Sequence, residues 1–207
     1  IDGRQQSAYG AGMQAPGELS APPSVTGGAR EARRLETRAR LFDAALAEIA
    51  HHGLAGADVS AIAAAAGVVR GTFYSHFPTK EHVLVELELS EEIKTVAELR
   101  GVPTEAGDLE TFLSLLVCHV LASERRLGPV VFRDMLGLHF SATRPVEDEL
   151  REHPLAGFVI AAISEAQAVE RVHHDADAGE LGVIFLTGLF ALLSTAGTAS
   201  RARSALL

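Results

Sequence analysis

The sequence predicts an all-α protein, with a small N-terminal group of three helices and a larger C-terminal helical domain. Alanine and leucine are abundant, whereas aromatic residues make up only 5% of the 207 residues. Such a composition favours helix over sheet. Apolar residues recur at spacings of three, four and seven along most of the chain, and no segment shows the alternation of a strand.

Residues 1–30 are expected to form a flexible arm, because they are rich in Gly, Ala, Pro and Ser and hold little that could build a core. A helical pattern starts at Glu31. Its apolar stripe consists of Leu35, Phe42, Leu46 and Ile49. Gly53 follows, and glycine at this position typically ends a helix.

Three further helices follow in quick succession. Asp58 is a good N-cap for a short second helix, which Gly67 ends. A third helix is expected over residues 68–77. Pro78 separates it from a long fourth helix, for which Thr79 is the expected N-cap.

Beyond residue 100, helical patterns alternate with short breaks. Further helices are expected near residues 108–124, 129–140, 145–171 and 178–200. Pro154 is expected to be a kink or a start within the third of these. The stretch 181–200 is uncharged over twenty residues, the length of a membrane span. Eight of those twenty are Gly, Ser or Thr, and a helix buried between its own domain and a partner subunit gives the same pattern, so we expect no membrane contact.

The net charge of −9 is distributed unevenly along the chain. Residues 30–80 hold seven positive and five negative side chains, whereas residues 81–207 hold ten positive and twenty negative ones. The positive segment contains the short second and third helices. This local excess hints that one part of an acidic protein contacts a polyanion, although solvated arginine clusters are also common.

The third helix has the residue types that a DNA-reading helix needs. Gly67 and the alanines before it allow two short helices to cross closely, and Val68, Phe73 and Phe77 can face inward. The opposite face then carries Arg70, Gly71, Thr72, Tyr74, Ser75 and His76. Side chains of these types reach guanine edges or phosphate oxygens. Lys80 begins the next helix, where its charge and the free N–H groups can hold a phosphate.

The segment TRARLFDAALAEIAHHGLAGADVSAIAAAAGVVRGTFYSHFPTKEHVL, residues 37–84, closely resembles the DNA-binding domain of the TetR (tetracycline-repressor) family of transcriptional regulators. The match runs without a gap through Ala66-Gly67-Val68, Gly71-Thr72-Phe73-Tyr74 and His76-Phe77-Pro78. The remainder of the chain resembles the family only in helical layout and length.

The resemblance implies a cytoplasmic, ligand-responsive regulator, most often a repressor. It would bind a pseudo-palindromic operator in double-stranded DNA as a homodimer, and a small, mostly apolar effector would release it. The two reading helices would then lie roughly 34–36 Å apart. The DNA-binding residues would be Arg38, Ser60, Arg70, Gly71, Thr72, Tyr74, Ser75, His76 and Lys80.

The resemblance also implies a division of the chain. Residues 31–80 would form the helix-turn-helix DNA-binding domain and residues 81–207 the ligand-binding and dimerisation domain, with the arm at 1–30. The dimer would form through the helices near 155–171 and 178–200, where Gly182 and Gly188 permit close contact.

Two residues depart from the family pattern. Val69 stands where members often carry Ser or Thr, so the third helix lacks a side-chain cap, which typically costs about 1 kcal/mol. Asp58 caps its helix well but repels nearby phosphates. An Arg-rich arm is expected to compensate, either on phosphates or in the minor groove as flexible arms do. It consists of Arg30, Arg33, Arg34, Arg38 and Arg40.

The candidate effector pocket consists of the larger or polar residues on apolar faces of the later helices: Phe112, Leu116, His119, Phe132, Met135, His139, Phe140 and Phe158. Each of them also fits ordinary core packing. Because charge is scarce on these faces, the expected ligand is apolar with one or two polar handles, met by His119 or His139.

No catalytic motif appears in the sequence. There is no HExxH, no paired-cysteine motif and no Gly-x-Ser-x-Gly elbow, and Cys118 is the single cysteine. HHDAD at residues 173–177 has ligand-type side chains, but a short loop rarely makes them converge. We therefore expect no enzyme, cofactor or metal. Two alternatives remain open: a helical enzyme or small-molecule binding protein that has lost DNA binding, and a membrane-anchored protein that uses residues 181–200.

Overall fold

The computed structural model describes residues 26–102, 105, 107–145 and 153–195. Within these residues the protein is all-helical, as predicted, with no strand. The helices are α1 (Thr26–Gly56), α2 (Val59–Ala65), α3 (Arg70–Tyr74), α4 (Glu81–Arg100), α5 (Leu109–Leu127), α6 (Pro129–Gly137), the 3₁₀ helix η1 (Leu138–Phe140), α7 (Pro154–Ala168) and α8 (Ala178–Ser194).

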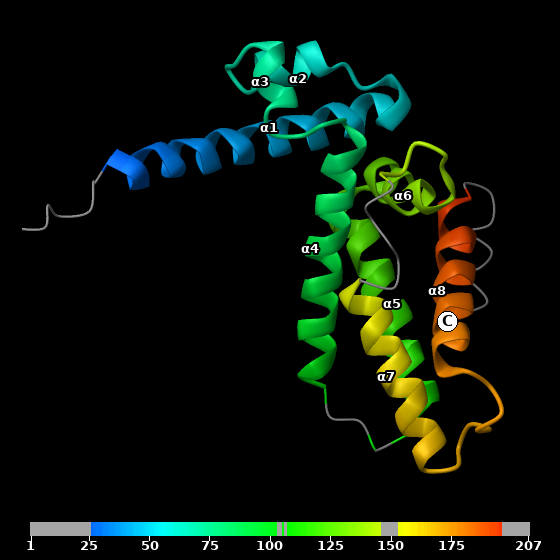
Figure 1. Ribbon diagram of the computed structural model, residues 1–207. Coiled ribbons are helices and arrows are strands. Elements are labelled where there is room, and N and C mark those ends of the chain that lie inside the picture. The colour runs from blue at the N-terminus through cyan, green and yellow to red at the C-terminus, as the bar shows by residue number, and fades with distance from the viewer. Residues whose placement is uncertain (1–25, 103–104, 106, 146–152, 196–207) are drawn as a thin grey trace, which may run out of the picture.

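The helices form a small head on a larger body (Figure 1). In the head, α1 carries α2 and α3 on the side away from the body. The body begins with α4, which runs away from α1 beside α5 and α7, while α8 packs on α7. Helix α6 lies at the corner, where it contacts α1, α5 and α8.

The first helix begins earlier than the sequence pattern indicated. It starts at Thr26 instead of Glu31, so the expected arm overlaps with its first turn, and residues 1–25 lie outside the described residues. Gly53 has a φ of 69° and interrupts the helix as expected, because glycine adopts this left-handed conformation without steric cost. One further turn continues to Gly56.

Three other helix boundaries also differ from the expected ones. Helix α3 spans only five residues of the expected ten. Thr79 does not cap α4, since Lys80 occupies the N-cap position and the Thr79 hydroxyl lies 3.0 Å from Nδ1 of His82. The helix expected at 145–171 begins at Pro154, where the ring is tolerated in the first turn; residues 146–152 lie outside the described part.

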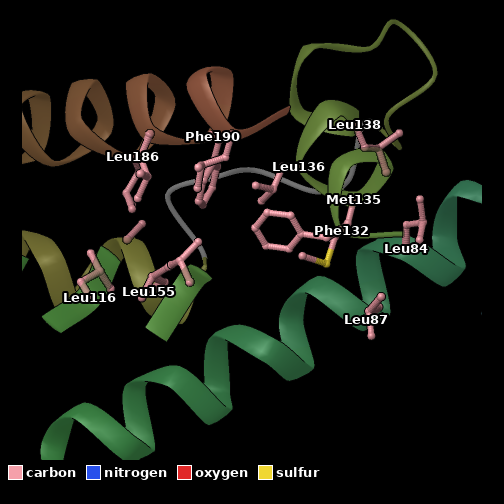
Figure 2. Packing of buried hydrophobic residues seen from close by; sticks show 14 of the residues in the cluster. Leu84, Leu87, Leu116, Phe132, Met135, Leu136, Leu138, Leu155, Leu186 and Phe190 are labelled. Carbon is pink, nitrogen blue, oxygen red and sulfur yellow. The ribbon is translucent and has the colours of Figure 1, made fainter. Parts of the chain in front are cut away.

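Two hydrophobic cores hold the protein together, and α1 and α4 contribute to both. The head core consists of Leu41, Ala45, Ile62, Ala66, Phe73, Phe77 and Val83. Ile49, one turn beyond Ala45 on α1, belongs to the body core, as does Leu84, the neighbour of Val83 on α4. In the body, Phe132, Leu136 and Phe190 converge between α4 and α8 (Figure 2). Head and body are therefore joined by continuous helices, not by a loose linker.

Most of the uncharged stretch at residues 181–200 belongs to α8, which ends at Ser194. Among the described helices, none is both long and apolar enough to cross a membrane. Residues 196–200 of that stretch lie outside the described residues.

Candidate nucleic-acid interface and effector cavity

The turn between α2 and α3 has the geometry that a helix-turn-helix requires. Gly67 takes a φ of 69°, and its N–H donates to the carbonyl of Ala64 at 3.0 Å. At the start of α2, Oδ1 of Asp58 accepts from the N–H of Ser60 at 2.9 Å, so the predicted cap is confirmed. These contacts define the two ends of α2, and the packing of Ile62 and Ala66 with Phe73 in the head core joins α2 to α3.

Helix α3 has one buried and one exposed side, as the sequence indicated. Phe73 is buried in the head core together with Phe77, just beyond the end of α3. Val69, at the start of α3, makes no side-chain cap and is 74% exposed. The predicted DNA-binding residues Ser60, Arg70, Gly71, Tyr74 and Ser75 are exposed, and Thr72 is half-buried. No atom would meet a Cβ at Gly71, so the backbone there is open to a partner surface.

Arg70 and Tyr74 form a pair one helical turn apart on this exposed side. Nη2 of Arg70 donates to the Tyr74 hydroxyl at 3.4 Å, and its guanidinium lies 5.9 Å from the centre of the ring. The Tyr74 hydroxyl raises the pKa of Arg70. A permanent positive charge is thus presented by a side chain that its neighbour orients.

Arg38 connects three parts of the head instead of standing free. Its guanidinium donates to the carbonyl of His76 and to the carboxylate of Glu86 on α4. It also lies over the ring of Phe77, 4.1 Å from its centre. Arg38 therefore fastens α1 to the segment after α3 and to α4, and any phosphate contact would compete with these partners.

His76 is half-buried at the same junction. Within the described residues, its buried Nδ1 has no hydrogen-bond partner. Burial lowers the pKa of His76, and the positive charges of Arg34 and Arg38 lower it further. The imidazole is therefore uncharged at neutral pH, and it can offer a phosphate a hydrogen bond but no charge.

Lys80 is tied to the end of α1. Its Nζ donates to the carbonyls of Ala55 and Ala57 at 3.0 and 3.2 Å. A lysine at this place satisfies carbonyls that α1 leaves unpaired. One of its three N–H groups is left for a phosphate, so Lys80 supports the head and can contact DNA at the same time.

The candidate effector cavity lies in the body between α4, α5, α6 and α8. It has a volume of about 30 Å³, enough for about two water molecules. Its apolar lining includes Phe132, Met135 and Phe190, and its polar lining includes Glu88, Glu91, Glu92, Thr95 and Ser123. The three acidic lining residues come from α4, whereas the candidate pocket residues come from α5, α6, η1 and α7.

The eight candidate pocket residues do not form one pocket. Phe132 and Met135 line this inner cavity, whereas Phe112 and Phe158 line a hollow of about 220 Å³ at the far end of α5 and α7. Phe140 borders a groove of about 650 Å³ between head and body. The other three, Leu116, His119 and His139, line none of these hollows.

Those three residues have other surroundings. Leu116 is buried in the body core. Nδ1 of His119 lies 2.8 Å from the carbonyl of Leu115, and its other ring nitrogen lies 3.7 Å from the carboxylate of Glu98. His139 contacts the carboxylate of Glu88. The imidazoles are thus engaged with the protein itself.

The glutamates of α4 are not among the site residues predicted from the sequence. Leu84, Glu88, Glu92, Thr95 and Leu99 follow one another at helical spacings of four, four, three and four, and all five are buried. Two acidic residues thus stand in an otherwise apolar stripe. This pattern was legible in the sequence, because charged residues at core-facing positions are rarely buried without a partner.

A second feature without a sequence signal is the joint between head and body. Oδ2 of Asp134 on α6 accepts from the N–H of Leu54 at 2.6 Å, directly after the kink at Gly53. A side chain at Gly53 would bring a Cβ to 3.3 Å from the same carboxylate oxygen. Helix α6, which lines the cavity, therefore holds the last turn of α1.

Comparisons with known proteins agree with this architecture. Residues 41–87 match the family model described as bacterial regulatory proteins, tetR family. A relative is the HTH-type transcriptional repressor SCO4008 of Streptomyces coelicolor, 31% identical over 117 residues, or 56% of this chain and 58% of that protein. Another is the HTH-type transcriptional regulator AcrR of Shigella flexneri, 37% identical over 89 residues, or 42% of this chain and 41% of that protein. The chain thus spans about half the length of the curated relatives it matches.

Solved structures share the fold over most of the chain. The fatty acid degradation regulator FadR of Bacillus halodurans matches with a TM-score of 0.55 at 26% identity, over 76% of this chain and 82% of that one. Thermus thermophilus FadR, a transcriptional repressor solved in complex with lauroyl-CoA, matches with a TM-score of 0.62 at 20% identity, over 82% and 88%. Both comparisons include head and body.

Proposed function

We propose that the chain is a ligand-responsive transcriptional repressor of the TetR family that binds a pseudo-palindromic DNA operator as a homodimer, a proposal supported by the match of residues 41–87 to the model of the tetR family and by the two curated relatives. The observation that carries the proposal is the exposed polar side of α3, held in place by the buried Phe73 and Phe77. Residues 31–80 are the DNA-binding domain in this proposal and residues 81–207 the ligand-binding and dimerisation domain. The regulator acts in the cytoplasm, and no catalytic step is part of its function.

The DNA contacts in this proposal fall into two groups. Arg70 and Thr72 read base edges, since they stand at the start of the exposed side of α3. Tyr74, Ser75 and Ser60 contact phosphates. Gly71 lets the backbone approach the duplex. The remaining predicted residues, Arg38, His76 and Lys80, chiefly hold α1, α3 and α4 together, and they contact phosphates only with the N–H groups that remain.

The dimer interface in this proposal centres on α8. Ile184, Gly188 and Leu192 lie four residues apart on one face, and all three are exposed in the single chain. Ile184 is 67% exposed. An apolar stripe of this kind on a helix of a water-soluble domain is typical of a contact between subunits. Gly182, in contrast, serves the chain itself, because a Cβ there would lie 2.8 Å from Ile160 on α7.

The regulatory step in this proposal is a movement of α4 and α6. A mostly apolar effector larger than a few water molecules enters the inner cavity only if these helices separate. Such a movement changes the Glu86–Arg38 contact at the top of α4 and the Asp134–Leu54 contact at the end of α1. The two heads of the dimer then lose their common spacing. A coupling of roughly 1–3 kcal/mol, or 5–150-fold in operator affinity, is usual for such switches.

The experiment that tests this function is selection of bound sequences from a pool of random DNA duplexes by the full-length protein. We expect enrichment of a two-fold symmetric sequence whose half-sites are about one helical turn apart. The Arg70→Ala, Thr72→Ala double variant should enrich no such sequence. Absence of enrichment by the unaltered protein at moderate salt would instead favour a helical binding protein without DNA recognition.

A further inference from the structure

Five charged or titratable side chains meet in the interior of the body. Glu88 and Glu92, one turn apart on α4, are only 2% and 4% exposed. His139 comes from η1, Arg144 from the segment after η1, and His153 stands immediately before α7. A buried carboxylate is costly unless a partner compensates it. Replacing buried ion pairs by apolar residues is often neutral or stabilising, so stability alone does not account for this composition.

The contacts within the cluster bring the donor atoms toward one centre. His139 contacts Oε1 of Glu88, and Arg144 donates to Oε2 of Glu88 at 3.1 Å. Nδ1 of His153 lies 2.8 Å from Oε1 of Glu92, whose Oε2 accepts from the N–H of Leu155 at 3.3 Å. The rings of His139 and His153 lie 6.1 Å apart. Three segments that are distant in sequence thus supply two carboxylates and two imidazoles.

We propose that Glu88, Glu92 and His153 form a binding site for a divalent transition-metal ion of the zinc type, with a water molecule or a bound ligand at the fourth position. One donor atom from each of the first three lies within 4.8 Å of the other two, and all three residues are buried. Two ligands of a tetrahedral zinc ion lie about 3.4 Å apart, since each is about 2.1 Å from the metal. Donor atoms up to 4.8 Å apart therefore need to approach one another by roughly 1.4 Å or less to close around an ion.

The chemistry of the donors favours zinc over magnesium or calcium. Imidazole nitrogen suits zinc, copper, iron and nickel, whereas the hard cations prefer oxygen ligands alone. Three protein ligands of the His and carboxylate type with an open fourth position are typical of zinc sites that bind water or a further ligand. Arg144 then takes the role of an outer partner, since it donates to the Glu88 oxygen that His139 does not contact.

The position of the site gives it a consequence for the switch, which rests on the proposed function. Glu86, two residues before Glu88 on α4, is the partner of Arg38 in the head. The ion would join α4 to the start of α7, and it would fix the helix on which the head depends. Metal binding would therefore stabilise one of the two head spacings and change operator affinity.

The test is a titration of the full-length protein, freed of metal with a chelator, with zinc chloride and with cobalt chloride. We expect one zinc ion per chain by calorimetry, and the visible absorption of four-coordinate Co²⁺. Glu92→Gln keeps the shape of the side chain, His153→Gln replaces the imidazole by a polar side chain of similar length, and each should lower zinc affinity by at least about tenfold. Circular dichroism establishes that each variant is folded.

Two control variants separate this site from unspecific binding. Glu91→Gln alters a neighbour that lines the same cavity but is held by Ser123 and Arg126. The double variant His173→Gln, His174→Gln removes the two imidazoles of the HHDAD loop. Both controls should bind zinc like the unaltered protein. The proposal is overturned if the unaltered protein binds no zinc, if binding survives in Glu92→Gln and His153→Gln, or if the loop double variant abolishes it.

Should Glu92→Gln not fold, the cobalt spectrum of the unaltered protein and the His153→Gln variant decide the matter. The metal titration needs no DNA, so it is independent of the proposed function. If the protein binds zinc but selects no operator, the metal site is supported and the repressor proposal is contradicted. An operator bound with the same affinity with and without zinc would overturn the regulatory consequence alone.

Discussion

The head and the body of this protein place their charged residues in opposite ways. In the head, the core is wholly apolar, and Arg70, Tyr74 and Ser75 lie on its outside. In the body, Glu88 and Glu92 lie inside, at a cavity lined by Phe132 and Phe190. In the proposed function, the DNA-binding surface keeps its charges in water, whereas the effector site uses the interior, where electrostatic interactions are stronger. The two proposed roles then belong to separate parts of the molecule, and α1 and α4, which contribute to both cores, connect them.

The largest effect is expected from a variant that disrupts the proposed dimer interface on α8. Ile184→Glu places a charge in the exposed stripe of α8 and should prevent dimer formation. Operator affinity should then fall by roughly 10²–10⁴-fold, because both half-sites can no longer be bound at once. Analytical ultracentrifugation and gel-shift titration measure the two effects. Arg171→Glu, an exposed charge reversal beyond the end of α7, is the control and should change neither.

The apolar core of the head is the next feature to break. Phe73→Ala should lower the free energy of unfolding by about 3–5 kcal/mol, as truncation of a buried phenylalanine usually does. Tyr74→Ala, at the adjacent but exposed position, should change it by less than about 0.5 kcal/mol. Urea denaturation followed by circular dichroism compares the two. Equal losses would show that Tyr74 belongs to the core and not to a reading surface.

A third variant sharpens the role of the exposed side of α3. Arg70→Ala should weaken operator binding by about 1–3 kcal/mol and relax the preference at one base pair. Because Arg70 is exposed, the unfolding curve should stay the same. Gel-shift titration against single-base operator variants measures both effects. A uniform loss across all operator variants would instead assign Arg70 to a phosphate.

The sequence could predict the core and the turn of the head, although not every helix boundary, because their determinants are local. The Asp58 cap, the Gly67 turn and the inward Phe73 each depend on neighbours a few residues away. The attachments of Arg38 to Glu86 and of Lys80 to Ala55 join residues 48 and 25 positions apart. No periodicity signals such contacts. The sequence therefore predicted Arg38 and Lys80 as DNA contacts, but it gave no sign of the contacts that they make within the protein.

In the body, periodicity predicted the helices but not what they enclose. The starts near 108 and 129 agree with the observed helices, since Asp108 caps α5 and Pro129 opens α6. The predicted pocket was a single site made largely of aromatic residues, but in the structure these residues line three separate hollows. Glu88 and Glu92, acidic residues at buried positions of α4, point to the inner cavity more directly than the aromatic residues do. A charge at a core-facing position says more about function than a further apolar residue does.

A smaller effect is expected at the start of α3. Val69→Ser supplies the side-chain cap that this helix lacks and should stabilise the protein by about 1 kcal/mol. The midpoint of urea denaturation measures the gain. Val69→Ala is the matched control, because it shortens the exposed side chain without adding an acceptor. A gain in both variants would attribute the effect to the loss of an exposed apolar side chain.

The smallest expected effect is a change in how the stability of the head depends on pH, and it arises from the half-buried His76. The pKa of His76 is lowered in the folded protein by burial and by Arg34 and Arg38. The unfolded chain therefore takes up this proton first, below its ordinary pKa of about 6.5. The stabilising contribution is complete above that pH and is lost as pH falls toward the lowered pKa. Urea denaturation at pH 7 and at pH 5 measures the loss in the free energy of unfolding, which should be smaller for His76→Gln than for the unaltered protein. Groups that titrate alike in both proteins cancel when the two losses are subtracted. A native imidazole that titrates by NMR at or above pH 6.5 would contradict this account.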